Sequence, residues 1–445
     1  MTKYLKLKLI ERRISMEVYS FFVILFATII LFVFSFNVVK KEDKSLKIKI
    51  LIICGMFYLY SGFGISNLSN PWSYAGKYII YLLTLLITII TVTKKQASGK
   101  EGLIDRVSNV FSNLFKVFAI IHILSILFQL IYPDFLLFKA LNPISILLDG
   151  DKASQVFINR VERTSNIILN INGYVKTLTL PFLYIFLYKK YGNSSKKIFA
   201  VIGILTYLQI AGRGQWGRAT LLIPFVFLFV YLYKQNKIKF RHLLIIGFIG
   251  SIILIPFMNA IAVWRQTGDF AIYGNGFMAS LAKFSTSEFS YPNFYDVSLY
   301  LNQNSENAFK YLAWLFTLPI PSSILGTNYL VSKTLSEYVL GVPYASSGFY
   351  IILPSWLGEG LITFGDNFYW INALIVGLVI GLMHRIIRNN KVLKVYDVYF
   401  IWLLISYLRS VSQEFIAQAI QTQWLLLMII IIYYIVPKRR IGSTN

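Results

Sequence analysis

Long apolar runs separated by short polar segments recur along almost the whole chain. Several runs hold about 20 mostly apolar residues, the length that crosses a bilayer as an α-helix. The pattern predicts an all-α polytopic membrane protein with about 11 (roughly 10–13) transmembrane helices, in a single integral membrane domain of residues 1–445. The expected spans are residues 17–39, 48–66, 74–93, 109–131, 166–188, 197–212, 219–233, 242–263, 367–387, 396–411 and 417–436.

Positive charge is concentrated in every second connection between these spans. An excess of Lys and Arg marks cytoplasmic loops, so these connections are expected inside and the alternate ones outside. Residues 1–15 do not fit, because the same alternation puts them outside although they are rich in Lys and Arg. Either Met16 is the true start, or this segment is an amphipathic helix on the inner surface and one span is miscounted. The basic connections include residues 40–49, 94–106, 189–197, 234–241, 385–394 and 438–440.

Composition supports the membrane class. The 445 residues are 56% hydrophobic and 14% charged, with a mean hydropathy of +0.62, whereas soluble domains are about one-quarter charged. The net charge of +24 follows from the basic inner connections, so nucleic-acid binding is not expected. The single cysteine, Cys54, excludes a disulfide framework and a Cys-based metal site. The first apolar run is too long for a cleavable signal peptide.

One long segment, residues 264–366, dominates the expected outer side. A structureless loop of that length is uncommon in a compact protein. Short helices at 308–320 and 345–364 are therefore expected to lie on, or dip into, the outer leaflet. The many aromatic residues of this segment suit either an interfacial belt or stacking against sugars.

Arginines mark the tightest of the expected outward turns. Arg213 and Arg218 lie among glycines between two apolar runs, in QIAGRGQWGRATLL. A guanidinium at the membrane edge is costly unless an anion pairs with it, and its planar fork binds two pyrophosphate oxygens at once. Arg265 and Arg409 are expected near the same surface. For each arginine the alternative is that it snorkels to lipid phosphates.

Carboxylates on the same side are the candidate acids and bases. Glu359 lies in the glycine-rich apolar stretch PSWLGEGLITFGDNF, where a carboxylate needs either a structural ion pair or a function. Glu414 lies five residues after Arg409, so it either contributes to substrate binding there or forms a salt bridge with that arginine. Asp149 and Asp151 form an Asp-X-Asp pattern that holds a cation in many glycosyltransferases. Their turn-like context favours a solvated turn, and no metal is expected.

The positions of the histidines and the lack of a phosphate-binding loop argue against histidine-dependent and nucleotide-dependent reactions. His242 and His384 fall at the cytoplasmic ends of expected spans, and His122 falls in mid-span. None of them faces the outer side, so an outer Ser-His-Asp or His-zinc mechanism is not expected. The glycine run GRGQWG does not follow a strand and is not a phosphate-binding loop.

Three stretches resemble the Wzy-type O-antigen and capsular repeat-unit polymerases. They are AGRGQWGRATLL, PSWLGEGLITFG and SYLRSVSQEF, at residues 211–222, 354–365 and 406–415. Many spans, a dominant outward loop late in the chain and outward arginines add to the likeness. The outline is also similar to the O-antigen ligases, which typically carry a loop histidine that is absent here.

This resemblance implies a membrane glycosyltransferase of the GT-C type in the bacterial cytoplasmic (inner) membrane. It would join undecaprenyl-pyrophosphate-linked repeat units on the outer face by inverting transfer, without metal or cofactor. Arg213 and Arg218 would bind and stabilise the pyrophosphate, and Glu359 would take the acceptor proton. Arg265 and Arg409 would either complete the same site or hold the pyrophosphate of the acceptor. The implied partners are lipid-linked oligosaccharides, membrane lipid and a chain-length regulator.

The main alternative is a lipid-linked oligosaccharide flippase or another secondary transporter. Such proteins have short loops on both faces and charges that line cavities in mid-membrane. Here the expected spans hold few charges and one outer segment is long. The sequence therefore favours the polymerase.

Overall fold

The computed structural model describes most of six of the 11 expected spans and part of the long outer segment. Every regular element in these parts of the chain is a helix, in agreement with the apolar pattern. Of some helical residues, including 3–18 and 218–223, only the backbone is described. The described residues are 3–40, 43–62, 70–94, 116–125, 218–234, 236–239, 291–301, 306–318, 330–344, 349–389, 396–408 and 411–420, with isolated residues between 68 and 346.

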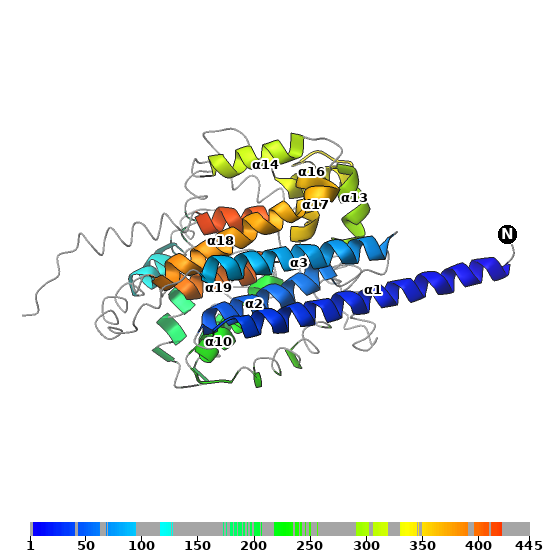
Figure 1. The fold of residues 1–445 in the computed structure, drawn as a ribbon. Helices are drawn as coiled ribbons and strands as arrows, with labels where there is room; N and C mark the ends of the chain where they lie inside the picture. Colours follow the sequence, from blue (N-terminus) through cyan, green and yellow to red (C-terminus); the bar gives the residue numbers. More distant parts are fainter. Residues whose placement is uncertain are drawn as a thin grey trace, which may run out of the picture.

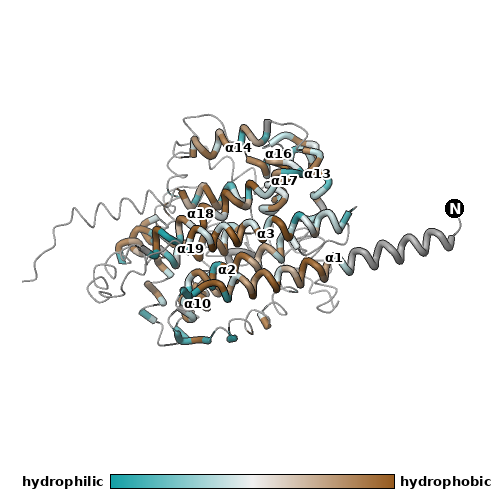
Figure 2. The backbone as a smooth tube through the Cα atoms, in the orientation of Figure 1, coloured by the Kyte–Doolittle hydropathy of each residue, from teal (hydrophilic) through white to brown (hydrophobic). Residues whose placement is uncertain are grey.

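Four helices within the described residues are long and apolar enough to cross a membrane. They correspond to the spans expected at 17–39, 48–66, 74–93 and 367–387, and they lie against one another as a bundle (Figure 1). Hydrophobic residues run along most of this bundle (Figure 2). The chain is therefore a helical membrane protein. The four are α1 (Lys3–Val38), α2 (Lys44–Phe57) with the π-helical turn η1 (Tyr58–Gly62), α3 (Pro71–Lys94) and α18 (Trp370–Asn389).

Three further expected spans are present, wholly or in part, as shorter helices within the described residues. One is the helix at Lys116–Ser125, inside the span expected at 109–131. The helix α10 (Arg218–Lys234) covers the span expected at 219–233. The helix α19 (Tyr396–Tyr407) covers most of the span expected at 396–411. The remaining expected spans lie largely outside the described residues, so the total of about 11 stays a prediction.

The first helix is longer than the span it contains. Residues 3–15 continue α1 without a break, so they do not form a separate amphipathic helix on the inner surface. This N-terminal part projects beyond the other helices, at the end of the bundle where α3 begins (Figure 1).

Two glycines bring α18 close to α3. A Cβ on Gly377 would lie 2.8 Å from the Cβ of Thr88, and a Cβ on Gly381 would lie 2.8 Å from the Cβ of Val92. Small residues four apart on one face allow helix backbones to approach closely in membranes. The contact therefore depends on glycine at both positions of α18.

Among the described residues, five short helices come from the segment expected to form the large outer loop. The helix expected at 308–320 is α14 (Glu306–Thr317). The helix expected at 345–364 is α17 (Ser355–Phe368), which begins later than expected. Separate helices before and between them were not expected. The short helices lie beside α18, near the start of α3 (Figure 1). The three helices that were not expected are η3 (Tyr291–Phe294), α13 (Tyr295–Leu301) and α16 (Val331–Leu340).

Candidate functional site

Glu359 of α17 binds the first turn of the helix at residues 412–420. Its side chain is fully buried, and the hydroxyl of Ser412 donates to its Oε1 at 2.7 Å. The backbone N–H groups of Ser412 and Gln413 donate to the same carboxylate, the latter at 3.1 Å. The first N–H groups of a helix lack intrahelical partners and carry partial positive charge. A carboxylate from a different helix therefore satisfies this helix terminus.

Gln413 extends the same arrangement to a second helix. Its side-chain oxygen accepts a hydrogen bond from the backbone N–H of Val331, the first residue of α16, at 2.9 Å. Gln413 is fully buried. Glu359 thus accepts hydrogen bonds from the N-terminus of the 412–420 helix, and Gln413 accepts one from the N-terminus of α16. These hydrogen bonds hold the three helices together.

Asn372 carries the network to α3 and α14. Its side-chain amide donates to the hydroxyl oxygen of Ser412 at 3.0 Å and to that of Tyr311 at 3.3 Å. Its Oδ1 accepts a hydrogen bond from the hydroxyl of Tyr81 at 2.5 Å. All four side chains are fully buried. Because buried polar groups are costly without partners, this network specifies how the four helices pack.

The surroundings of Glu359 determine its protonation. Burial has the largest effect and raises the pKa of Glu359 to about 8, although the hydrogen bonds from Ser412 and Gln413 lower it. The nearby carboxylate of Glu414 raises it further. A carboxyl group removed from water favours its neutral form. Glu359 therefore changes charge in the neutral to mildly basic range.

Unusual backbone conformations position α17. Ser355 has a φ of 62°, in the left-handed region, and its hydroxyl accepts a hydrogen bond from the N–H of Gly358 at 3.4 Å. Such a conformation costs roughly 1–3 kcal/mol and recurs at functional sites. Gly365, with a φ of 80°, interrupts the helix near its end. A Cβ on Gly360 would lie 2.7 Å from the carbonyl oxygen of Tyr369, so only glycine fits there.

The interruption at Gly365 brings Asp366 to α3. Its Oδ1 lies 2.9 Å from the Nζ of Lys77, and its side chain is 56% exposed, compared with 12% for Lys77. Lys77 also donates to the hydroxyls of Ser73 and Tyr295, both at 2.8 Å. We call Ser73, Lys77, Tyr295 and Asp366 the Lys77 cluster. It combines one cation, one exposed carboxylate and two hydroxyls.

The Lys77 cluster and the Glu359 network lie along one face of α3. Ser73, Lys77 and Tyr81 are four residues apart, and this spacing places them above one another on a helix. The rise is about 6 Å for each step. The exposed Asp366, near the start of α3, and the buried Glu359 thus belong to two groups of polar contacts that are one helical turn apart on α3. The charge pattern of the connections predicts that this end of the bundle faces outward.

The structure describes only some of the residues selected from the sequence. Arg213, Arg265 and Arg409 lie outside the described residues, as do Asp149 and Asp151. Arg218 is the first residue of α10, and its side chain is not described.

The two selected carboxylates are described. Glu414 is half-buried, one residue after Gln413 in the helix that Glu359 binds. The structural ion pair considered for Glu359 is replaced, among the described residues, by hydrogen bonds from Ser412 and Gln413. Glu359 therefore lies against the stretch that contains Arg409 and Glu414.

Several residues of this site were not selected from the sequence. Lys77 was regarded as a charge near the end of a span, and Asp366 as one of many outer acids. Tyr81, Asn372 and Ser412 resemble ordinary polar residues of membrane helices. The spacing of Ser73, Lys77 and Tyr81 on one helical face was the available signal.

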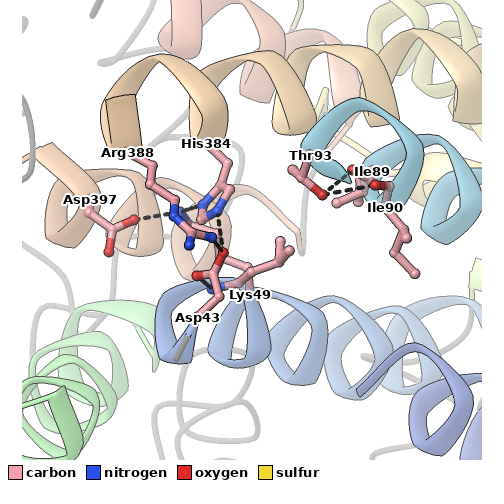
Figure 3. A network of polar contacts seen from close by, with 9 residues as sticks. Asp43, Lys49, Ile89, Ile90, Thr93, His384, Arg388 and Asp397 are labelled. Carbon is pink, nitrogen blue, oxygen red and sulfur yellow. Dashed lines mark hydrogen bonds and ion pairs between the residues drawn. The ribbon is translucent and has the colours of Figure 1, made fainter. Parts of the chain in front are cut away.

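A second polar cluster lies at the other end of the bundle, where α18 ends and where α2 and α19 begin (Figure 3). Lys49 of α2 binds the Nδ1 of His384 at 2.8 Å and the Oδ1 of Asp397 at 2.5 Å. The Nε2 of His384 lies 3.1 Å from the Oδ2 of Asp43, which also accepts a hydrogen bond from Arg388. Lys49 and His384 are 0% and 1% exposed. We call these five residues the Lys49 cluster.

The hydrogen bonds of the Lys49 cluster determine which ring nitrogen of His384 carries the proton. A protonated Lys49 can only donate, so the Nδ1 of His384 accepts and its Nε2 carries the proton that is donated to Asp43. With a neutral histidine, two cations balance two carboxylates. Asp43 also accepts the N–H of Leu46 at 3.1 Å and so caps α2.

The Lys49 cluster changes one interpretation of the sequence. Lys44, Lys47 and Lys49 were counted as charges of an inner connection, but all three belong to α2. Lys49 is buried among helices, and the expectation that the spans hold few charges does not apply at this end of the bundle. Ionisable residues within membrane helices are functional candidates by default.

Metal ligands do not gather in the described part of the chain. No group of three or more His, Cys, Asp or Glu side chains there is arranged to hold a metal ion. Comparison of the chain with protein-family models, with curated proteins and with solved structures finds no match.

Proposed function

We propose that the protein is a repeat-unit polymerase of the bacterial cytoplasmic membrane, with a GT-C-like architecture. It transfers a growing glycan from undecaprenyl pyrophosphate to a new lipid-linked repeat unit on the outer face, with inversion at the anomeric carbon. Outward arginines bind the pyrophosphate. A chain-length regulator is the partner that such an activity calls for.

One observation carries this proposal. Glu359 of PSWLGEGLITFG binds Ser412 and Gln413 of SYLRSVSQEF, 53 and 54 residues further along the chain. Two of the three stretches that resemble the polymerases therefore meet through a fully buried carboxylate. A buried carboxyl group is costly unless hydrogen bonds compensate for its removal from water. Such a contact supports a common role for the two stretches.

The contact also suggests a role for Glu359 as a positioning residue. By holding the first turn of the 412–420 helix, it fixes the end of the chain segment that contains Arg409. A fixed guanidinium stabilises developing negative charge without reorganisation during the reaction. Arg218 begins α10, so a pyrophosphate bound to it would also face N–H groups of a helix terminus.

Complementation tests this function. A polymerase-deficient strain that makes the matching repeat unit receives the wild type, Arg213→Ala or Arg218→Ala, and polymer length is measured beside the amount of protein in the membrane. We expect normal membrane amounts and single-repeat glycans for both variants, because the pyrophosphate loses its counter-charge. The matched control is Arg241→Ala, an exposed arginine of an inner connection, which should make full-length polymer.

The outcomes test the polymerase function and the proposed arginine site separately. Full-length polymer from both outward variants would show that their turn is structural. Failure of the wild type in strains with different repeat units would overturn the polymerase itself.

A flippase or other transporter is the second candidate, and the Lys49 cluster favours it. Buried acids, a histidine and a lysine joined by hydrogen bonds form proton relays in transporters. The position of the repeat units discriminates between the two functions. Loss of a polymerase leaves single units exported to the outer face, whereas loss of a flippase leaves them inside the cell.

A further inference from the structure

We propose that Asp366 is the catalytic base of the transfer reaction and that Lys77 holds it in position. This inference rests on the proposed polymerase function and identifies the group that takes the acceptor proton. It concerns an exposed carboxylate at the end of the bundle that is expected to face outward, where lipid-linked substrates would arrive.

Access separates Asp366 from Glu359. A base must come within hydrogen-bond reach of the hydroxyl from which it removes a proton. Glu359 is fully buried, and both of its oxygens bind Ser412 or Gln413. The side chain of Asp366 is 56% exposed, and only its Oδ1 is joined to Lys77. Of these two carboxylates on α17, only Asp366 can meet a substrate without rearrangement of the helices.

The backbone of α17 presents Asp366. Gly365 adopts a φ of 80° and a ψ of −176°, which side chains with a Cβ rarely allow. The helix is therefore interrupted one residue before Asp366. This break directs the carboxylate to Lys77 on α3 instead of along the face of α17.

Lys77 holds the carboxylate of Asp366 in position. Its Nζ lies 2.9 Å from Asp366 and is itself held by Ser73 and Tyr295 at 2.8 Å. The hydroxyls of Ser73 and Tyr295 are 2.9 Å apart, which closes the ring of contacts. A lysine with three donors satisfied in this way is a rigid anchor. The anchor therefore fixes where the Asp366 carboxylate lies relative to α3.

The reaction step balances as follows. The hydroxyl oxygen of the acceptor sugar forms a bond to the anomeric carbon of the donor. The bond between that carbon and the pyrophosphate oxygen breaks, and its electron pair stays on undecaprenyl pyrophosphate. The proton of the acceptor hydroxyl passes to a carboxylate oxygen of Asp366, which later releases it to water. Neither an oxidant nor a metal enters the balance.

The test uses the purified full-length protein in liposomes, with a lipid-linked repeat unit as both donor and acceptor. We expect Asp366→Asn to lower the rate of elongation about 10²- to 10⁴-fold, the usual contribution of a general base. Asp366→Ala should lose as much and recover part of its rate when formate is added, because formate can replace the missing carboxylate. Asp296→Asn, at an exposed acid of α13, is the matched control and should elongate normally.

A positioning role predicts a different response for Lys77. Lys77→Met leaves the carboxylate in place but removes its anchor, so the rate of elongation should fall. Lys77→Arg keeps a cation that can hold Asp366 and should recover most of that rate. Wild-type elongation together with full activity of Asp366→Asn would overturn this inference and leave the polymerase standing. Absence of formate rescue in a well-folded Asp366→Ala would also overturn it. Absence of wild-type elongation would instead count against the polymerase.

Discussion

At the residue scale, the chemistry of Glu359 is decided by its partners. A carboxylate in an apolar stretch suggests an ion pair, yet this one accepts hydrogen bonds from a helix N-terminus. The N–H groups compensate for part of the cost of burial but leave the neutral acid favoured, with the pKa near 8. Stability and protonation are therefore linked at this position.

This linkage predicts how stability varies with pH. The pKa of Glu359 in the folded protein, about 8, is above its ordinary value of 4.5, so the folded state binds the extra proton between these values. Its contribution to stability is complete below pH 4.5 and is lost as the pH rises through about 8. We expect the thermal midpoint in detergent to fall as the pH rises from about 5 to about 8. The fall should be smaller in Glu359→Gln, and an equal fall in both proteins would contradict the assignment.

The same residue separates a positioning role from a catalytic one. Glu359→Gln keeps an oxygen that accepts hydrogen bonds from Ser412 and Gln413, so we expect a stable protein that still makes polymer. Glu359→Ala leaves these donors unpaired beside a cavity and should destabilise the protein by roughly 2–4 kcal/mol. Thermal unfolding and polymer length in the same membranes are the measurements. A stable Glu359→Gln that makes no polymer would restore Glu359 as the base.

At the element scale, close packing between α3 and α18 determines where the polar groups meet. Gly377 and Gly381 leave no room for a Cβ against Thr88 and Val92. Tyr81 of α3 reaches Asn372 of α18 because the helices approach this closely. The Lys77 cluster depends on the same alignment, since Lys77 lies one turn before Tyr81 on α3.

Substitutions of the glycines test this packing. Gly377→Ala and Gly381→Ala should each cost about 1–3 kcal/mol, because the added methyl group forces α18 away from α3. Gly76→Ala on α3 is the matched control, since nothing lies within 4 Å of its Cβ position. It should be neutral or slightly stabilising, because alanine favours a helix by about 1 kcal/mol relative to glycine. Thermal midpoints in detergent compare the three, and equal values would show that the contact adapts.

At the scale of the whole molecule, the proposed chemistry requires the Lys77 cluster to face outward. The Lys49 cluster, at the other end of the bundle, should then face the cytoplasm. This arrangement follows from the basic connections between spans and from the antiparallel order of α1, α2 and α3.

Labelling of single cysteines tests this orientation. Cys54 is the only cysteine and is buried, so Cys54→Ser provides a background without thiols. Asp296→Cys on α13 should react with an impermeant maleimide in intact cells, and Lys237→Cys after α10 should react only once the membrane is opened. Both positions are exposed. The reverse pattern would place the Lys77 cluster inside and exclude a lipid-linked acceptor from the outer face.

The sequence by itself determined the membrane class and the approximate positions of the described spans. The length of an apolar run is a local property, and a bilayer requires about 20 such residues wherever they occur. The ends of helices were less exact: α17 begins at Ser355, after residues 349–354, which form no regular structure and which the apolar pattern does not distinguish from a helix.

Only the tertiary structure decided which polar residues work together. Glu359 meets Ser412 across 53 residues, and Lys49 meets Asp397 across 348. The need of each group for a partner can be read locally, but the partner's identity depends on which helices pack against each other. Asp366 shows the same limit, because its exposure and its contact with Lys77 follow from the break at Gly365 and the position of α3. A buried charge is satisfied by whatever the fold brings beside it, and that information is distributed over the whole chain.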